Sequence, residues 1–246
     1  MKIGIIGNGN VGTHLNNALS EDAGNNVCLI NSRTFEGLET DCDLLLICVK
    51  DDAIERVAAE IAKHIPDYQG TVAHTSGSVS MDILRSRFHN CGVLYPLQTF
   101  TKQRELNYAE IPVFIEARTE ESENLLRMAS SSFTDKIYQA DSEKRKALHV
   151  GAVLSCNFVN FLYGKAEEIL KENGYDFSVL YPLIKETLER TRDKSPTETQ
   201  TGPAARGDFN VINSHLEFLG DKPDTERIYR LLTNSIYIGS KEQIER

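Results

Sequence analysis

Three glycines near the start of the chain have the spacing of a phosphate-binding turn. Gly7, Gly9 and Gly12 directly follow a short apolar stretch and open a helical pattern. In such a turn the first glycine allows the sharp bend, the second lets the backbone approach a pyrophosphate, and the third permits close helix–strand packing. The free N–H groups of the helix then face the phosphates. The motif predicts a dinucleotide site, and a ligand-free glycine turn is the alternative. The expected contacts are Gly7, Asn8, Gly9, Asn10, Val11 and Gly12.

The end of the second expected strand, over residues 27–30, indicates which dinucleotide is bound. An acidic side chain there would bind the ribose 2′-hydroxyl of NAD. The chain instead carries Asn31, Ser32 and Arg33, and the planar fork of an arginine suits a 2′-phosphate. NADP is therefore the predicted cofactor. In the alternative interpretation, Arg33 is a solvated surface residue.

Two further strand ends should reach the same site, because ligands lie beyond the carboxyl ends of parallel strands. The third expected strand ends at Val49 and Lys50, and the fourth at His74, Thr75 and Ser76. His74 and Ser76 are polar groups placed where a nicotinamide or a substrate would lie, so Ser76 is also a catalytic candidate. Alternatively, Thr75 and Ser76 cap the helix that follows. The additional cofactor contacts expected are Val49, Lys50, His74 and Thr75.

The elements that must position these residues follow from the hydrophobic periodicity of residues 1–140. Strands are expected over residues 2–6, 27–30, 44–49, 70–74, 92–94, 111–115 and 136–138. Helices are expected over residues 10–22, 51–64, 81–87 and 120–130. This alternation is typical of a doubly wound parallel sheet, and the nearly all-apolar strands suit a sheet covered on both faces. The predicted fold is an α/β domain of Rossmann type.

No strand pattern returns after residue 140. Asp141 or Ser142 is expected to cap a helix that runs to about residue 172 and is apolar most of the way round. Such a helix is either the spine of a helical domain or half of a subunit interface. Further helices are expected over residues 177–192, 208–219 and 225–237. The predicted organisation is an NADP-binding domain over residues 1–140 and an all-helical domain for substrate binding and dimerisation over residues 141–246.

Composition argues against several classes of protein. Lys plus Arg number 27 and Asp plus Glu number 36, which gives a net charge of −9, and without a basic stripe nucleic acid is a poor partner. The longest apolar run, residues 44–49, is too short to cross a membrane, and Met1 does not open a signal peptide. The five cysteines and the six histidines are scattered and show no metal-ligand spacing. The cysteines fit the buried thiols of a cytosolic protein better than a disulfide framework. We expect a cytoplasmic, metal-free protein.

With these residues in view, the chain resembles the 6-phosphogluconate-dehydrogenase-like NADP oxidoreductases, which include pyrroline-5-carboxylate reductase, ketopantoate reductase and hydroxyisobutyrate dehydrogenase. It is most similar to an uncharacterised bacterial family with a Rossmann-like N-terminal domain and a helical C-terminal domain of unknown function. The matching stretches are residues 7–12, 31–33, 42–54, 74–77, 92–100, 146–160 and 201–208. The resemblance implies hydride transfer between the nicotinamide and a small carbonyl, hydroxy acid or imine. It also implies a homodimer formed through the helical domain.

Some dehydrogenases of that group carry the motif Lys-x-x-His-Asn on the long helix. This chain has Lys146 and His149, with Val150 in place of the Asn. The replacement favours an alternative function, an NADP-binding sensor or regulatory protein without turnover. The function predicted first is an NADP(H)-dependent oxidoreductase that acts on a small polar metabolite in a cleft between the domains.

Helical geometry groups the polar residues of that helix. At about 100° per residue, two neighbouring stripes form. One contains Arg145, His149, Cys156 and Asn160, and the other contains Lys146, Val150, Val153 and Asn157. Buried imidazoles and amides need partners, so the stripes indicate a site or hydrogen bonds within a core or dimer interface.

In the functional interpretation, Lys146 or His149 donates the proton, Asn157 orients the substrate and Asn160 contacts it. The loop over residues 201–208 adds Arg206, which could bind a substrate carboxylate in bidentate fashion. In the alternative interpretation, that loop simply ends in an Asp208 helix cap.

Overall fold

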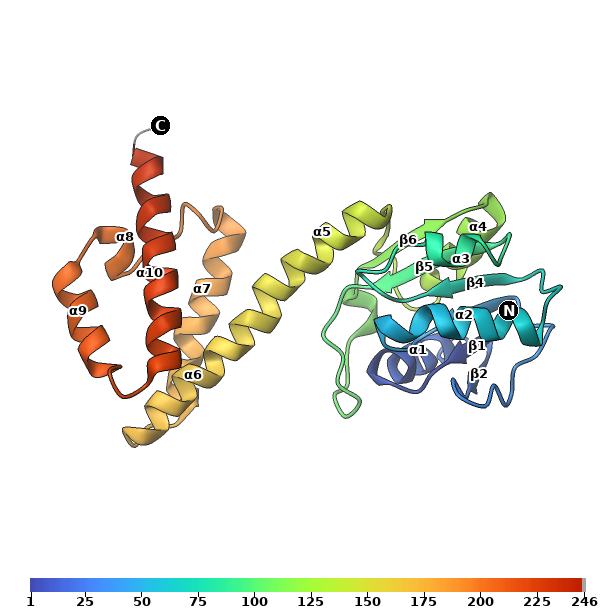
Figure 1. Cartoon of the computed structure of the whole chain (residues 1–246), viewed down its shortest axis with the longest axis horizontal. Coiled ribbons are helices and arrows are strands. Elements are labelled where there is room, and N and C mark those ends of the chain that lie inside the picture. The colour runs from blue at the N-terminus through green and yellow to red at the C-terminus, as the bar shows by residue number, and fades with distance from the viewer. Residues whose placement is uncertain (245–246) are drawn as a thin grey trace. The chain divides into compact units, whose positions relative to one another are not determined.

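The computed structural model describes residues 1–244, with side chains through residue 239. The chain divides into two compact units, Met1–Phe158 and Val159 onward. The first unit contains a β-sheet covered by helices, and the second consists of helices (Figure 1). Each unit is described by itself below.

The first unit is built on a seven-stranded sheet with the order β2-β1-β3-β4-β5-β6-β7. The strands are β1 (Lys2–Ile6), β2 (Asn26–Ile30), β3 (Leu44–Ile47), β4 (Thr71–His74), β5 (Cys91–Pro96), β6 (Val113–Ala117) and β7 (Ile137–Gln139). Strands β2, β1, β3, β4 and β5 are parallel to one another. Because the chain winds from β1 outward in both directions, the structure confirms the predicted Rossmann-type fold.

Strand β6 departs from the expected parallel arrangement. It runs antiparallel to β5, with Leu94 opposite Ile115, and β7 then pairs with β6 in parallel. The connection from β5 to β6 contains only the short 3-10 helix η2 (Tyr108–Glu110). A parallel neighbour usually requires a crossover helix, and this connection contains no α-helix, so the chain returns antiparallel.

Helices cover both faces of the sheet because neighbouring strand residues point to opposite sides. Ile5 packs on the face covered by α1 (Asn10–Ser20) and α4 (Glu120–Ser131). The next residue, Ile6, packs on the face covered by α2 (Ile54–His64) and α3 (Asp82–Arg85). The 3-10 helix η1 (Asp51–Ala53) leads into α2. Burial on both faces explains why β3 and β4 have no exposed residue.

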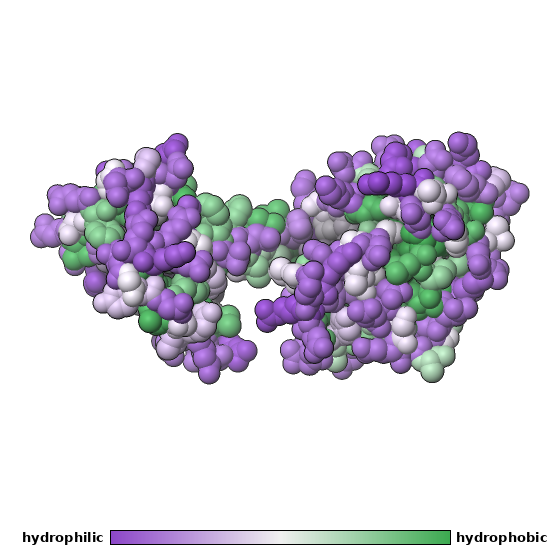
Figure 2. Space-filling view, turned by 90° about the horizontal axis from the view of Figure 1, so that it is seen from below, coloured by the Kyte–Doolittle hydropathy of each residue, from purple (hydrophilic) through white to green (hydrophobic). Residues whose placement is uncertain are grey.

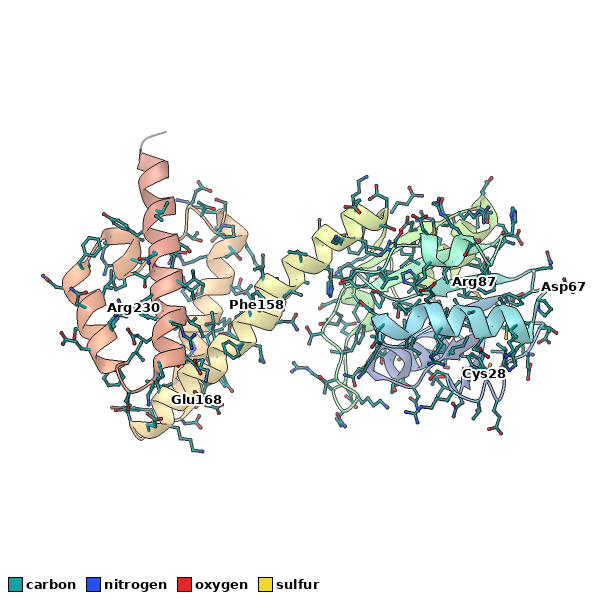
Figure 3. All side chains as sticks on the ribbon, in the orientation of Figure 1. Cys28, Asp67, Arg87, Phe158, Glu168 and Arg230 are labelled. Carbon is teal, nitrogen blue, oxygen red and sulfur yellow. The ribbon has the colours of Figure 1, made fainter. Side chains whose placement is uncertain are left out.

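The long helical segment begins at Ser142, capped by Asp141, whose Oδ1 accepts the Lys144 N–H at 2.8 Å. It consists of α5 (Ser142–Ala152), the π-helical turn η3 (Val153–Asn157) and α6 (Phe158–Glu172). The expected domain boundary near residue 140 falls between β7 and α5. The first compact unit nevertheless extends to Phe158 (labelled in Figure 3), and α5 is attached to it by the buried Arg145.

The second unit is all-helical over the part of it that the structure describes. After α6 come η4 (Phe177–Leu180), α7 (Tyr181–Asp193), α8 (Pro203–Arg206), α9 (Phe209–Phe218) and α10 (Pro223–Ile244). Asp208 caps α9, accepting the Val211 N–H at 3.4 Å. Helix α10 continues past the expected end at residue 237.

Within the described residues, the helix Ser142–Glu172 is long and apolar enough to cross a membrane by length and composition alone. The core helix of a soluble protein passes the same test, but none of this apolar window is buried. Val150, Leu154 and Phe158 are all more than half exposed. Figure 2 shows the corresponding hydrophobic surface on the segment that joins the two units in the chain.

Candidate active site

The glycine turn between β1 and α1 is packed so that only glycine fits at two of its positions. A Cβ at Gly12 would lie 2.1 Å from the Gly7 carbonyl oxygen, and one at Gly7 would lie 2.5 Å from the Cys48 carbonyl oxygen. Gly7 also has a φ of +110°, which L side chains rarely adopt. These contacts hold the start of α1 tightly against the ends of β1 and β3.

Gly9, in contrast, faces open space. The nearest atom to a Cβ at Gly9 would be the Cys48 oxygen at 4.0 Å, and Gly9 precedes α1 without any side-chain cap. The first N–H groups of α1 are therefore left for a ligand, and the positive end of the helix dipole favours an anion there. The turn fits the pyrophosphate of a dinucleotide.

A hollow of about 410 Å³ lies at the end of β2. It is lined by Asn8, Leu29, Ile30, Asn31, Ser32 and Arg33. Asn31 Oδ1 accepts the N–H groups of Arg33 at 2.8 Å and Thr34 at 3.2 Å, so the amide shapes the turn. Arg33 itself is exposed. This geometry leaves a guanidinium and the Ser32 hydroxyl available for a phosphate.

A second cavity, of about 450 Å³, opens where β3, β4 and β5 end. Its walls come from the start of α1, the loops after these three strands, and the α5–η3 segment. It is lined by Asn10, Val11, Val49, Asp51, Thr75, Ser76, Gly77, Tyr95, Pro96, Leu97, Gln98, Thr99, Phe100, His149, Ala152, Cys156 and Asn157. This is the edge of the sheet where the sequence predicted the site.

The cavity brings together many of the residues singled out in the sequence. The predicted residues on its walls are Asn10, Val11, Val49, Thr75, Ser76, His149 and Asn157. Lys50 and Lys146 are exposed and lie outside the lining. Asn160 and Arg206 belong to the second unit, where both are exposed. Cys156 is also exposed rather than a buried thiol.

The π-helical turn η3 explains which residues of the long helix reach the cavity. A π turn contains more residues than an α turn, so the 100° spacing cannot be carried from α5 through η3. The expected stripes are therefore wrong in detail: Asn157 shares the cavity wall with His149 and Cys156, whereas Asn160 does not.

Ser76 shapes the loop after β4. Its Oγ accepts the N–H groups of Ser78 and Val79, both at 3.1 Å. Helix α3 begins only at Asp82, after Met81, so the alternative that Ser76 caps this helix is wrong. In both bonds the Ser76 oxygen is the acceptor, so its hydroxyl proton is available to donate into the cavity.

His74 is fully buried and outside the cavity lining. Its Nδ1 accepts the Ser76 N–H at 3.2 Å. Its Nε2 has no hydrogen-bond partner of good geometry among the described residues. The nearby Ser80 backbone acts to raise the pKa of His74, but its effect is the smallest of the three. Burial, followed by the nearby Arg145 charge, lowers the pKa of His74 to about 3. The ring is neutral and supports the loop from inside.

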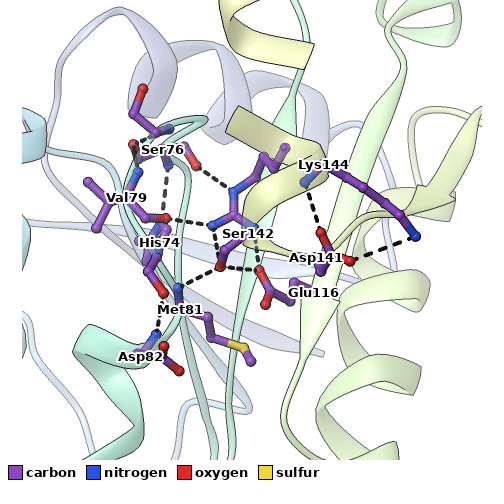
Figure 4. Close-up of polar contacts among 12 residues, drawn as sticks. His74, Ser76, Val79, Met81, Asp82, Glu116, Asp141, Ser142 and Lys144 are labelled. Carbon is purple, nitrogen blue, oxygen red and sulfur yellow. Dashed lines mark hydrogen bonds and ion pairs between the residues drawn. The ribbon is translucent and has the colours of Figure 1, made fainter. Parts of the chain in front are cut away.

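Arg145 fixes the same loop to α5, and the sequence stripe did not reveal this role. Its Nε donates to the Ser76 carbonyl at 3.1 Å, its Nη2 donates to the Val79 carbonyl at 2.5 Å, and its Nη1 pairs with Glu116 on β6. Figure 4 shows this network, in which Ser142 also donates to Glu116 at 2.9 Å. Arg145 Nη2 also donates to Ser142 on α5 at 3.3 Å, so the buried guanidinium has partners from the loop after β4, from β6 and from α5.

Tyr95, at the end of β5, was missed in the sequence. Its hydroxyl lies 3.1 Å from His149 Nδ1, and both residues line the cavity. Gly77 makes room for the pair, since a Cβ there would lie 2.7 Å from Tyr95 and 2.9 Å from His149. Burial raises the pKa of Tyr95, so its phenol is protonated at neutral pH.

Comparison with solved structures supports the fold of the whole chain. A Bacteroides fragilis protein described as a "putative NADP oxidoreductase" is 36% identical, with a TM-score of 0.88, over 96% of this chain and 97% of that one. An imine reductase from Streptomyces aurantiacus is 11% identical, with a TM-score of 0.64, over the full length of both chains. A pyrroline carboxylate reductase from Plasmodium falciparum, solved with NADP bound, is 12% identical, with a TM-score of 0.61, over 98% of each chain. At these lower identities the likeness shows the fold alone.

Comparison with curated proteins finds no match. A family described as a domain of unknown function, DUF2520, matches residues 111–236, which include β6, β7, the α5–η3 wall of the cavity and most of the second unit. Together with the 36% identity to the Bacteroides fragilis protein, this match shows that the chain belongs to the DUF2520 family.

Proposed function

We propose that this protein is an NADP(H)-dependent oxidoreductase that transfers a hydride to or from a small polar carbonyl, hydroxy acid or imine. The observation that carries the proposal is the cavity of about 450 Å³. One wall is the start of the predicted dinucleotide helix at Asn10 and Val11, and the others present Ser76, Tyr95 and His149. A nicotinamide extending from the glycine turn would enter a space lined by groups able to move a proton.

The residues of the first unit fit the pyrophosphate and the 2′-phosphate of NADP. The uncapped α1 N-terminus and the open face of Gly9 suit the pyrophosphate. The turn shaped by Asn31 presents Ser32 and Arg33 to a 2′-phosphate. When bound, the dinucleotide supplies or accepts the hydride. The neighbours described as NADP oxidoreductase, imine reductase and pyrroline carboxylate reductase support this chemistry.

Calorimetric titration tests the cofactor assignment. Wild-type protein should bind NADPH much more tightly than NADH, and Arg33→Ala should remove most of the difference, because only NADPH carries the 2′-phosphate. Arg56→Ala, on the exposed surface of α2, is the matched control and should keep the preference. If neither nucleotide bound at millimolar concentration, the proposed function would fail.

A sensor without turnover is the alternative, and Val150 favours it. This residue replaces the Asn of the dehydrogenase motif and is 51% exposed. The two functions differ in turnover: His149→Gln should retain NADPH binding in both cases, but only an enzyme loses a catalytic rate. Steady-state oxidation of NADPH with small carbonyls and imines separates them.

For the apolar surface of the helical segment from Val150 to Phe158 we propose a second copy of the chain as the partner. Val150, Leu154 and Phe158 are more than half exposed, and contiguous apolar surface of this kind marks an interaction site. Symmetric dimers are the commonest oligomers of soluble chains. Light scattering of the full chain should give a dimer, and Leu154→Glu should yield a monomer. A monomeric wild type would contradict the proposed dimer. Co-flotation of the wild type with neutral lipid vesicles would also contradict it, because the apolar surface would then bind lipid.

A further inference from the structure

Two tyrosine–histidine pairs in the first unit have nearly the same geometry. The Tyr95 hydroxyl lies 3.1 Å from His149 Nδ1, with ring centroids 6.1 Å apart at 71°. The Tyr108 hydroxyl lies 3.0 Å from His14 Nδ1, with ring centroids 6.0 Å apart at 68°. The surroundings of the second ring nitrogen distinguish the two pairs.

In the Tyr108–His14 pair the proton positions are fixed. His14 Nε2 lies 2.9 Å from the Thr101 carbonyl oxygen, which can only accept. A neutral His14 therefore carries its proton on Nε2, and its Nδ1 must accept the Tyr108 hydroxyl proton. His14 is only 2% exposed. This pair is a closed structural contact that ties α1 to the loop after β5.

In the Tyr95–His149 pair the second nitrogen is open. Among the side chains described, through residue 239, His149 Nε2 makes no hydrogen bond, and the ring is half-buried on the cavity wall. Nothing commits the proton of His149 to Nε2, so Nδ1 can carry it and donate to the Tyr95 oxygen. The hydroxyl proton of Tyr95 is then free to point into the cavity.

We propose that Tyr95 is the proton-transferring residue of this cavity and that His149 is its relay to solvent. The inference deepens the proposed oxidoreductase function and rests on it. Neither the DUF2520 description nor the sequence motifs assign a role to Tyr95. Gly77 supports the pair sterically, because any side chain there would collide with both rings.

The proton transfer balances with the hydride step. During reduction, the substrate carbon receives the hydride, and the carbonyl oxygen or imine nitrogen takes the Tyr95 hydroxyl proton. The Tyr95 oxygen takes the proton of His149 Nδ1, while His149 Nε2 takes one proton from water and leaves a hydroxide in the solvent. The sum is one hydride and one proton added to the C=O or C=N bond, and no charge remains on Tyr95. Oxidation runs the same proton path in reverse.

Charged neighbours act on this pair from two sides. Arg145 on α5 lowers the pKa of Tyr95 and Asp51 on η1 raises it, but both effects are smaller than the effect of burial. The net result is a raised pKa, which keeps the phenol protonated and able to donate. A general acid in this position contributes roughly 100- to 10,000-fold to a rate.

The first measurement uses the full chain without cofactor, labelled with ¹⁵N-histidine. Long-range ¹H–¹⁵N spectra reveal which ring nitrogen carries the proton, and His149→Gln assigns the signal. We expect the His149 proton on Nδ1 in the wild type and on Nε2 in Tyr95→Phe. Tyr108→Phe, the matched control, should shift His14 and leave His149 unchanged. A wild-type His149 protonated on Nε2 alone would overturn the relay.

The second measurement follows NADPH oxidation with glyoxylate and 2-methyl-1-pyrroline as carbonyl and imine probes. Tyr95→Phe should lower kcat about 100-fold or more, while the Kd for NADPH stays within about twofold. Tyr108→Phe should keep kcat within about twofold. Unchanged kcat in Tyr95→Phe would overturn the role of Tyr95 and leave the oxidoreductase function standing. If the wild type bound NADPH but reduced neither probe, both proposals would fail together.

Discussion

Arg145 on α5 and Glu116 on β6 form an ion pair inside the first unit. The Arg145 side chain is almost completely buried, and Glu116 retains only 14% side-chain exposure. The same guanidinium donates to the backbone carbonyls of Ser76 and Val79. One side chain therefore holds the helix that carries His149 against the loop that carries Ser76. Cavity walls separated by about seventy residues in the chain are joined at this point.

Replacement of Arg145 should strongly destabilise the first unit. Arg145→Met leaves the Glu116 carboxylate without its charged partner and two carbonyls without donors. Breaking a buried ion pair in this way costs about 3–5 kcal/mol. Urea unfolding should show a correspondingly lower midpoint, and the double variant Arg145→Met/Glu116→Gln should recover part of the loss.

Lys144→Met is the matched control on the same helix. Lys144 forms an exposed pair with Asp141 at 3.7 Å, and such pairs contribute about 1 kcal/mol or less. Equal destabilisation by the two Met variants would contradict the role given to Arg145.

The glycine turn should separate folding from binding. Gly12→Ala places a Cβ 2.1 Å from the Gly7 oxygen, so α1 must move and both thermal stability and NADPH binding should fall. Gly9→Ala meets nothing nearer than 4.0 Å, and Gly9 has a φ of −80° that alanine accepts. This variant should unfold at the wild-type temperature but bind NADPH at least about tenfold more weakly, or about 1.4 kcal/mol. Full affinity in Gly9→Ala would place the pyrophosphate elsewhere.

The glycine turn and the doubly wound sheet could be predicted because they depend on local pattern. Residue type at Gly7 and Gly12, and apolar runs such as β3, determine backbone geometry and burial directly. The antiparallel β6 was not predicted, although the lack of a helical pattern between it and β5 was a usable signal in the sequence. The π-helical turn η3 gave no signal in the sequence, because the residues from Val153 to Asn157 are compatible with an α-helix. Its effect was to move Asn157 into the cavity lining and to leave Asn160 out of it.

Tyr95 could have been found by the rule that identified Ser76. Both residues stand at the carboxyl end of a parallel strand, where ligands bind. Within the aliphatic run of β5, however, Tyr95 looks like a core residue, and it is in fact 8% exposed. Its contact with His149 joins residues 54 positions apart, and such a contact depends on the tertiary fold. Arg145 escaped prediction for the same reason, since its partners are on β6 and in the loop after β4.

The five cysteines should differ sharply in reactivity toward a thiol reagent. Cys156 is exposed at the cavity. Burial raises the pKa of Cys48 to about 12 and that of Cys42 to about 12, so these thiols lack the reactive thiolate at pH 8. One rapid phase with a disulfide reagent is expected, and NADPH should slow it by filling the cavity. Cys156→Ser should abolish the rapid phase, whereas Cys28→Ser should retain it; the reverse pattern would contradict the exposure of Cys156.

The stability of the first unit should fall in mild acid because of His74. Its pKa is lowered to about 3 in the folded chain, whereas an unfolded histidine titrates near 6.5. Between these values the unfolded chain binds the extra proton, so the free energy of unfolding decreases as the pH falls, by up to about 1.4 kcal/mol per pH unit. His74→Asn keeps an acceptor for the Ser76 N–H and removes the titration. Urea unfolding at pH 7 and pH 5 should therefore show a smaller difference in the free energy of unfolding for His74→Asn than for the wild type.

His89→Asn is the control, because His89 is exposed to water in the folded chain, and it should retain the wild-type difference. An unchanged pH dependence in His74→Asn would mean that other groups cause the acid sensitivity.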